Sequence, residues 1–270
     1  DTSGQEIKSF SSEEAPADPQ KAAEGKKNGK KDEKKEPRVP KEAGTNRFAW
    51  NMRYPDPIRL TEGFMGGDNG LVGPMVAPGT YQVRLTAGEQ NMTVSFEIQK
   101  DPRVTASQRD LEDQCTLLLR VRDRLSETHE AITLIRDTRQ QVEQWEQRTQ
   151  KHEQHEAIAE SAKGVKEQLA AIEEELIQVK ARTRQDTLNH PAKLNAKITA
   201  LTGVVASADA APTEQAYALY DYLVAQLQQQ QQRLQTCLET ELAAFNRLMR
   251  ELELPAVLQP LVKKGFSTTG

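Results

Sequence analysis

The chain has 270 residues, a formal net charge of −4 and 36% hydrophobic residues. Typical soluble domains hold about 45–50% apolar residues when glycine is counted, so this chain lies slightly below that range. No stretch approaches the roughly 20 apolar residues of a membrane-spanning helix, and no basic excess indicates a nucleic-acid partner. The two cysteines, Cys115 and Cys237, exclude a disulfide framework. We expect two thiols, although helices packed antiparallel would bring these residues near each other.

The N-terminal residues begin with a short predicted strand and continue into a charged segment. Gln5–Ser12 is the predicted strand, and because the first residue is Asp1 we interpret the chain as an excised or processed piece. Residues 13–43 are rich in lysine and contain a single bulky aliphatic residue, Val39. Such a segment buries too little apolar surface to offset its ordering entropy, so we expect a disordered, solvated insertion. A polybasic patch for phosphate or anionic lipid is the alternative, weakened by the interleaved acids.

Apolar residues with a period of two predict a small antiparallel β unit over residues 46–100. Asn46–Tyr54 is its first predicted strand. Tyr81–Leu85 and Met92–Ile98 are predicted to form a hairpin, because each run has one apolar face and a glycine lies in the connection. Two or three strands are marginally stable by themselves. We therefore expect further strands, either from Gln5–Ser12 or from sequence upstream of the chain.

After Asp101-Pro102 the apolar period changes to 3.5, which predicts four amphipathic helices packed against one another. The first helix is expected to begin with a capping box formed by Thr105 and Gln108 and to run to about Gln150. The second should end near Pro191, because a residue before proline avoids the helical region. A short third helix follows, and Thr213 is predicted to cap a long fourth helix.

The sequence contains no candidate catalytic, cofactor-binding or metal-binding site. His152–Glu156 has two histidines three residues apart, whereas the zinc-protease motif needs a spacing of four, so we interpret it as a hydrated helix connection. Gly63–Gly73 lacks the Gly-Lys-Ser/Thr ending of a phosphate loop and is predicted to be a mobile connection. Glu173–Glu175 is interpreted as a solvated helix face rather than a catalytic carboxylate pair. Gln231 and Glu241 lie on the apolar seam of the last helix. They indicate either that water reaches the seam at these positions or that the seam contains a polar pocket.

Five segments of the sequence, taken in order, resemble segments of a known protein family. They are Gly44–Pro55 (GTNRFAWNMRYP), Ala77–Thr86 (APGTYQVRLT), Lys100–Val104 (KDPRV), Leu125–Ala131 (LSETHEA) and Leu201–Thr213 (LTGVVASADAAPT). Together they resemble the C-terminal region of large bacterial exported proteins built on sortilin-like β-propellers. Those proteins carry BNR or Asp-box repeats and are often labelled glycosyl-hydrolase-like.

The resemblance implies a context for the chain. It implies an upstream β-propeller of the same parent protein as the partner, and an exported, periplasmic or extracellular location. Gly4–Ser12 fits the strand that precedes a variable linker in the family, and the Lys-rich segment fits that linker. The propeller itself is not in this sequence, and no catalytic residue of the family maps onto it.

Pattern and resemblance together predict an α+β chain with two segregated parts. Residues 1–104 are expected to form a partial immunoglobulin- or fibronectin-like antiparallel β-sandwich, and residues 105–270 an antiparallel bundle of long helices. The first functional hypothesis is a non-catalytic accessory region that braces the propeller or binds a protein. The alternatives are a contribution to a glycosidase-like hydrolase whose active site lies in the propeller, and an adaptor that self-associates through coiled-coil-like helices. None of these functions calls for a cofactor in this chain.

Overall fold

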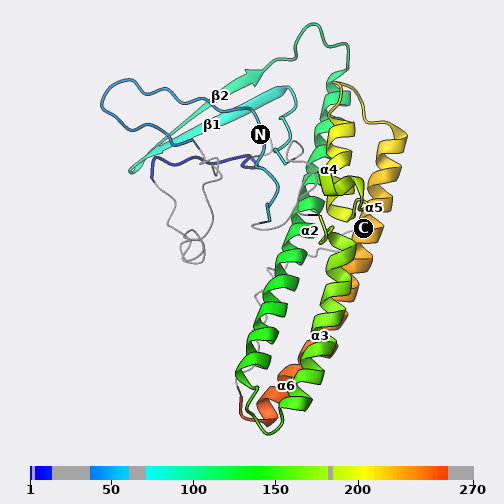
Figure 1. Cartoon of the computed structure of the whole chain (residues 1–270). Helices are drawn as coiled ribbons and strands as arrows, with labels where there is room; N and C mark the ends of the chain where they lie inside the picture. Colours follow the sequence, from blue (N-terminus) through cyan, green and yellow to red (C-terminus); the bar gives the residue numbers. More distant parts are fainter. Residues whose placement is uncertain (2–3, 14–36, 61–70, 182–184, 255–270) are drawn as a thin grey trace. The chain divides into compact units, whose positions relative to one another are not determined.

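The chain is α+β, with a two-stranded antiparallel sheet followed by helices (Figure 1). The computed structural model describes residues 1, 4–13, 37–60, 71–181 and 185–254, without the side chain of Thr187. Most of the predicted Lys-rich insertion and of the predicted glycine-rich connection therefore lies outside the described residues. The chain divides into two compact units. We call Asp1–Pro55 with Pro74–Asp101 the β unit, and Asp56–Gly73 with Pro102–Gly270 the helical unit.

The predicted hairpin is confirmed in the β unit. Strands β1 (Gly79–Ala87) and β2 (Gln90–Ile98) pair antiparallel, from Gly79 opposite Ile98 to Ala87 opposite Gln90. The two-residue connection places Gly88 at φ 59°, in the left-handed region that glycine adopts without a steric penalty. The register puts Tyr81, Val83 and Leu85 on one face, together with the apolar residues of β2.

The other two predicted strands are not strands in the structure. Asn46–Tyr54 makes one isolated bridge, between Arg53 and Met75. The reason is local, because Met52 has a left-handed φ of 55° and the indole nitrogen of Trp50 donates a hydrogen bond to the Arg53 carbonyl at 3.2 Å. This turn interrupts the alternation that the apolar pattern predicts. Gln5–Ser12 joins no ladder of the described residues, although the Ser11 carbonyl accepts a hydrogen bond from the Val39 amide at 3.1 Å.

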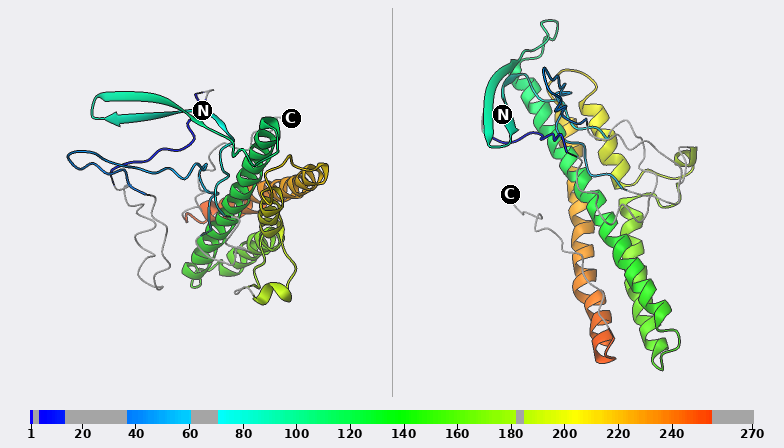
Figure 2. Two further views of the ribbon diagram at one scale, coloured as in Figure 1. Left: turned by 90° about the horizontal axis from the view of Figure 1, so that it is seen from above. Right: turned by 90° about the vertical axis from the view of Figure 1, so that its left-hand side faces the viewer.

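Within its described residues, the helical unit contains five α-helices and two short helical turns. They are α2 (Gln108–Arg148), α3 (His155–Leu176), the 3-10 turn η2 (Gln185–Leu188), α4 (Leu194–Val205), α5 (Glu214–Cys237), the π turn η3 (Leu238–Leu242) and α6 (Ala243–Glu251). Since η3 joins α5 directly to α6, residues 214–251 form one long helix. Figures 1 and 2 show α2, α3 and this long helix side by side, with α2 and α5 running in the same direction and α3 opposite to both.

Two predicted helix boundaries are corrected and one is confirmed. The capping box of α2 is formed by Ser107 and Asp110, because the Ser107 hydroxyl accepts from the Asp110 amide and the Asp110 carboxylate accepts from the Ser107 amide. Thr105 and Gln108 do not form it. Helix α3 ends at Leu176, well before Pro191, where Ile177 turns to an extended conformation and stays buried. The Thr213 hydroxyl accepts from the Ala216 amide at 3.2 Å and caps α5 as predicted.

The helical unit has one continuous apolar core. Buried leucine, isoleucine and valine residues of α2, α3, α4 and α5 form it, and Phe245 and Met249 of α6 complete it. Leu60 and Leu71, which flank the undescribed part of the 56–73 segment, are buried in the same core. Within the described residues, no helix combines the length and the hydropathy needed to cross a lipid bilayer.

Candidate functional site

One side of the β-hairpin carries a row of apolar side chains, which we call the hairpin face. Its three cross-strand pairs are Tyr81 with Phe96, Val83 with Val94, and Leu85 with Met92. The alternate pairs point to the other side and are polar, namely Thr80 with Glu97, Gln82 with Ser95, Arg84 with Thr93, and Thr86 with Asn91. The hairpin is therefore strongly amphipathic, as expected for a sheet with one face directed at an apolar layer.

The hairpin face is covered at one end and open at the other. Tyr81 is 8% exposed and its hydroxyl donates to the Ala77 carbonyl at 2.6 Å. The Trp50 ring lies edge-on to Tyr81 and to Phe96, with ring centroids 6.3 Å and 6.5 Å away. Towards the turn the exposed fraction rises to 56% at Val83 and 66% at Met92. Thus Trp50 packs against the first pair, in which Tyr81 is buried and Phe96 is 37% exposed, and the residues of the next two pairs are each more than half exposed.

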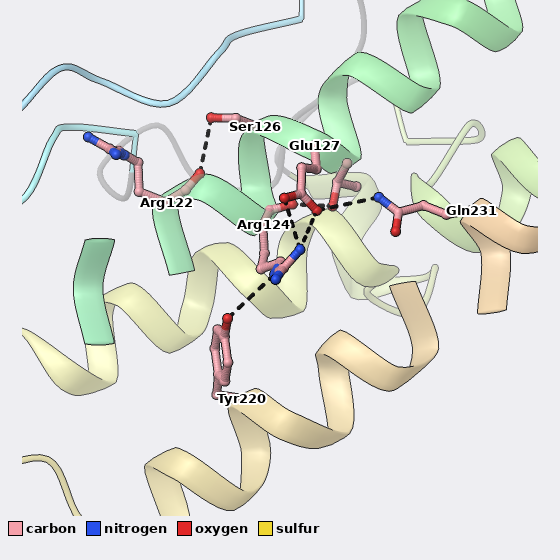
Figure 3. A network of polar contacts seen from close by, with 7 residues as sticks. Arg122, Arg124, Ser126, Glu127, Tyr220 and Gln231 are labelled. Carbon is pink, nitrogen blue, oxygen red and sulfur yellow. Dashed lines mark hydrogen bonds and ion pairs between the residues drawn. The ribbon is translucent and has the colours of Figure 1, made fainter. Parts of the chain in front are cut away.

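A network of polar contacts joins α2 to α5 in the helical unit (Figure 3). The Arg124 guanidinium donates to both Glu127 carboxylate oxygens, at 2.9 Å and 2.7 Å, and to the Tyr220 hydroxyl at 3.5 Å. Burial lowers the pKa of Arg124, but the contacts with Tyr220 and Glu127 outweigh it and the net pKa is raised. Gln231 donates to Glu127 at 3.4 Å. The polar seam residue Gln231 is therefore part of a helix-joining contact, whereas Glu241 is exposed.

Glu173 holds two arginines of α2 against α3. Its carboxylate accepts from Arg136 Nε and from Arg139, each at 2.6 Å. The Glu173 side chain is only 6% exposed, so the prediction of a solvated face is wrong for this residue, while Glu174 and Glu175 are exposed. Beside the three paired residues is a shallow cleft of about 260 Å³.

His129 joins Ile58 to α2. Its Nδ1 lies 2.5 Å from the Ile58 carbonyl oxygen, and the Ile58 amide donates to the Ser126 hydroxyl at 3.1 Å. Within the described residues, His129 Nε2 is buried with no hydrogen-bond partner. Burial lowers the pKa of His129, and the nearby charge of Arg136 adds to this effect. A buried neutral imidazole held by a backbone carbonyl is a structural contact here.

The residues that the sequence singled out for chemistry are not brought together. In the turn between α2 and α3, His152 Nδ1 accepts from the Gln154 amide at 3.1 Å, and His155 begins α3. Among the described residues, no group of three or more histidine, cysteine, aspartate or glutamate side chains is arranged to hold a metal ion.

Cys115 and Cys237 are buried and form no disulfide. Because α2 and α5 run in the same direction, Cys115 near the start of α2 and Cys237 at the end of α5 lie at opposite ends of the helices. The sequence predicted that the two cysteines would lie near each other if these two helices were antiparallel. The helices are not antiparallel, so the cysteines are not brought together. Burial, together with the charge of Glu241, raises the pKa of Cys237 to about 11, so this thiol is not ionised at neutral pH.

Sequence reasoning missed the pairing of Glu173, although a signal for it was present. Glu173 follows Ile172 and precedes Leu176 on the apolar stripe of α3, where an acid is costly unless it is paired. Arg136 and Arg139 are spaced by three residues on the predicted first helix, which places both on one side of it. An acid on the apolar seam of one helix, together with two arginines on one side of another helix, therefore indicates an ion pair between the two helices.

Comparisons with protein-family models, with curated proteins and with solved structures found no match for this chain. The geometry of the described residues is thus the basis for function. It consists of a hairpin with an open apolar face and a helical unit in which buried polar groups join segments.

Proposed function

We propose that this chain is a non-catalytic accessory region that supports a larger β-rich protein. The observation that carries the proposal is the use of the buried polar groups in the helical unit. Glu173 joins α3 to α2, and His129 joins Ile58 to α2. Gln114 of α2 donates to the carbonyl of Val205, the last residue of α4, and to that of Ala208 just after it. The hydrogen bonds of these groups hold helices and loops in place.

The same proposal includes the finer architecture. The β unit would be a partial immunoglobulin- or fibronectin-like sandwich, and the helices an antiparallel bundle of long helices. The antiparallel contacts of α2 with α3 support the second statement. Glu173, late in α3, pairs with Arg136 and Arg139, whereas Lys166, earlier in α3, pairs with Glu146, which lies further along α2. The amphipathic hairpin supports the first, because sandwich strands direct alternate residues to the opposite sheet.

The partner in this proposal is the one that the resemblance to exported sortilin-like propeller proteins implies. The chain would follow a β-propeller in one periplasmic or extracellular polypeptide, and its long helices would brace that propeller. A helix of 41 residues is about 62 Å long at 1.5 Å per residue. That length exceeds the diameter of a small domain, and it suits a rigid support.

Deleting residues 105–270 from the propeller-bearing protein tests the accessory function. We expect the unfolding temperature of the propeller to fall and its cleavage by protease to accelerate, while turnover per folded molecule on glycoside substrates is unchanged. The isolated 270-residue chain should turn over neither glycosides nor peptides. A large loss of kcat with the propeller still folded would instead favour the hydrolase alternative, in which this region contributes residues to the active site.

An adaptor function through the helices has one observation in its favour. Leu219 and Tyr222 lie one turn apart on α5, and both are exposed, Tyr222 by 60%. Sedimentation velocity of the purified chain across a hundredfold concentration range tests this function. A dimer that disappears in the Tyr222→Lys variant would support it, and a monomer at every concentration would remove it.

A further inference from the structure

Residues 56–60 of the helical unit, which we call the strap, lie against α2 and belong to no helix or strand. Two α2 side chains one turn apart hold both backbone polar groups of one strap residue. The Ile58 amide donates to the Ser126 hydroxyl at 3.1 Å, and the Ile58 carbonyl oxygen lies 2.5 Å from His129 Nδ1. The Ser126 hydroxyl in turn donates to the Arg122 carbonyl, as Figure 3 shows. The strap is therefore fixed to α2 through the amide and the carbonyl of Ile58.

The contact with Ile58 determines which nitrogen of His129 carries the proton. A carbonyl oxygen only accepts, so Nδ1 of the neutral ring donates to Ile58 and Nε2 is unprotonated. His129 is completely buried, and among the described residues its Nε2 has no hydrogen-bond partner. A second proton, on Nε2, would place a positive charge and an unsatisfied N–H donor in a buried site. Both are unfavourable away from water, so the docked strap favours the neutral ring.

Among the described residues of α2 and α3, the charged groups do not offset a charge on His129. The positive charge of Arg136 acts on His129 and disfavours its protonation. Glu173, the buried charged residue of α3, is already bound to Arg136. The α2 residues one turn away from His129 are uncharged, and they are Leu125, Ser126, Ile132 and Thr133.

The strap, α4 and α5 also pack against α2, and their charged residues do not supply an acid for His129 either. Asp56 and Arg59 of the strap are exposed and pair with each other at 3.3 Å. The charged residues of α4 and α5 are exposed, and they are Lys197, Glu214, Asp221 and Arg233. Within the described part of the chain, a protonated His129 is therefore stabilised by water after the site opens.

The strap can leave α2 at a smaller cost than a helix can. Ile58 and Arg59 are exposed, and Leu60 is the strap residue that packs in the apolar core. Helix α2 contributes buried residues along its whole length, from Leu111 to Val142. A short segment with few buried apolar contacts opens locally at a lower free energy than the whole unit. Because Ile58 lies on the Nδ1 side of the ring, detaching the strap opens this side of His129 to water.

We infer that the strap is released by acid, such that protonation of His129 detaches residues 56–60 from α2 while the helices stay folded. The docked strap is most stable above the ordinary histidine pKa of about 6.5 and becomes less stable as the pH falls below it. Between about pH 7.5 and about pH 5.5, the ratio of docked to released strap should fall by up to about tenfold. This inference is independent of the proposed accessory function, since every group in it belongs to the helical unit.

Amide hydrogen exchange of the 270-residue chain, followed by NMR, tests the release. The Ile58 amide reports on the strap, and the amides of Ile132 in α2 and Leu169 in α3 report on the helices. After correction for intrinsic exchange rates, Ile58 should be protected at least about tenfold less than the two helix amides at about pH 5.5. Its protection should fall between about fivefold and tenfold from about pH 7.5 to about pH 5.5. Low urea should hardly change exchange at Ile58, because release of the strap exposes little surface.

Two variants separate His129 from other titrating groups. His129→Asn keeps an N–H donor near the position of Nδ1 and takes up no proton in this pH range, so the protection of Ile58 should change by less than about twofold. Glu130→Gln removes the neighbouring exposed acid and should keep the fall of the original chain. The ring nitrogens of His129 in the unaltered chain give a measurement that needs no variant. At about pH 7.5 we expect NMR to show the proton on Nδ1 and none on Nε2.

Four outcomes would overturn the inference. Equal protection and equal urea dependence of Ile58 and the helix amides would mean that the strap opens only when the whole unit unfolds. Protection of Ile58 that does not change with pH would remove the proton from the release. An equal fall in His129→Asn would assign the pH response to another group. A proton on Nε2 at about pH 7.5 would exclude the hydrogen bond from the neutral His129 ring to Ile58.

Discussion

The helical unit and the β unit bury their apolar residues in different ways. In the helical unit, the apolar seams of α2, α3, α4 and α5 close on one another, and residues such as Ile132 and Leu227 are completely buried. In the β unit, the hairpin face leaves Val83 and Met92 exposed. The difference shows that a set of helices can supply every side of its own core, whereas two strands supply only one layer and need another.

The largest expected effect comes from the core of the helical unit. Phe245→Ala removes a fully buried ring of α6 and should lower the free energy of unfolding by about 3–5 kcal/mol, because a cavity remains. Val83→Ala on the hairpin face should change it by less than about 0.5 kcal/mol. Urea unfolding followed by circular dichroism at the helix band measures both. Similar losses for the two variants would contradict the comparison between the units.

The pairing of α2 with α3 should give the next largest effect. Glu173→Ala leaves Arg136 and Arg139 facing each other without their shared carboxylate, and should cost about 1–3 kcal/mol. The adjacent exposed residue provides the control, and Glu174→Ala should cost less than about 0.5 kcal/mol. Both values come from the same urea unfolding experiment. Equal effects would mean that Glu173 does not hold the two helices together.

The corrected start of α2 predicts a smaller effect. Ser107→Ala removes the hydroxyl that accepts from the Asp110 amide and should cost about 1 kcal/mol. Thr105→Ala should have almost no effect, since Thr105 lies outside the capping box of the structure. Thermal unfolding of the two variants distinguishes the capping box of the structure from the one that the sequence predicts.

The lowered pKa of His129 predicts that the folded chain loses stability as the pH falls below neutral. Burial lowers the pKa of His129 in the folded chain below the ordinary histidine value of about 6.5, so the unfolded chain binds the proton more tightly. The stability that neutral His129 contributes is fully present above pH 6.5 and is lost as the pH falls towards the folded pKa. Urea unfolding between pH 7.5 and about 5.5 measures this slope. A His129→Gln variant should lose stability less steeply than the original chain, and an equal slope in the two chains would contradict this role of His129.

Elements with a long, regular apolar period were predictable from the sequence. The hairpin follows from the alternation in Tyr81–Leu85 and Met92–Ile98, and the Thr213 cap of α5 follows from a threonine before an apolar run. Asn46–Tyr54 shows the limit of this reasoning. Its alternation is as clear as that of the hairpin, but the left-handed Met52 and the Trp50–Arg53 hydrogen bond break the strand. Strand formation depends on a neighbour to pair with, and periodicity does not reveal that neighbour.

The candidate contacts were less predictable than the elements, because they join residues that are far apart in the chain. Glu173 meets Arg136 and Arg139 only after α3 folds back antiparallel on α2, and within the acidic run its pattern resembles that of Glu174 and Glu175. The open state of the hairpin face also depends on what the rest of the chain leaves uncovered. Apolar alternation predicts a buried face, and the structure shows that Trp50 contacts only the first of its three pairs and that Tyr81 alone among the six residues is buried.

The sequence by itself determined where the chain changes from strand to helix, because the spacing of apolar residues changes from two to 3.5 near Pro102 and each spacing matches the geometry of one backbone conformation. Only the tertiary structure decided the directions of the helices, the partners of the buried charges and the exposure of the hairpin face. These features depend on which surfaces remain after all segments have packed, and packing is a property of the whole folded unit.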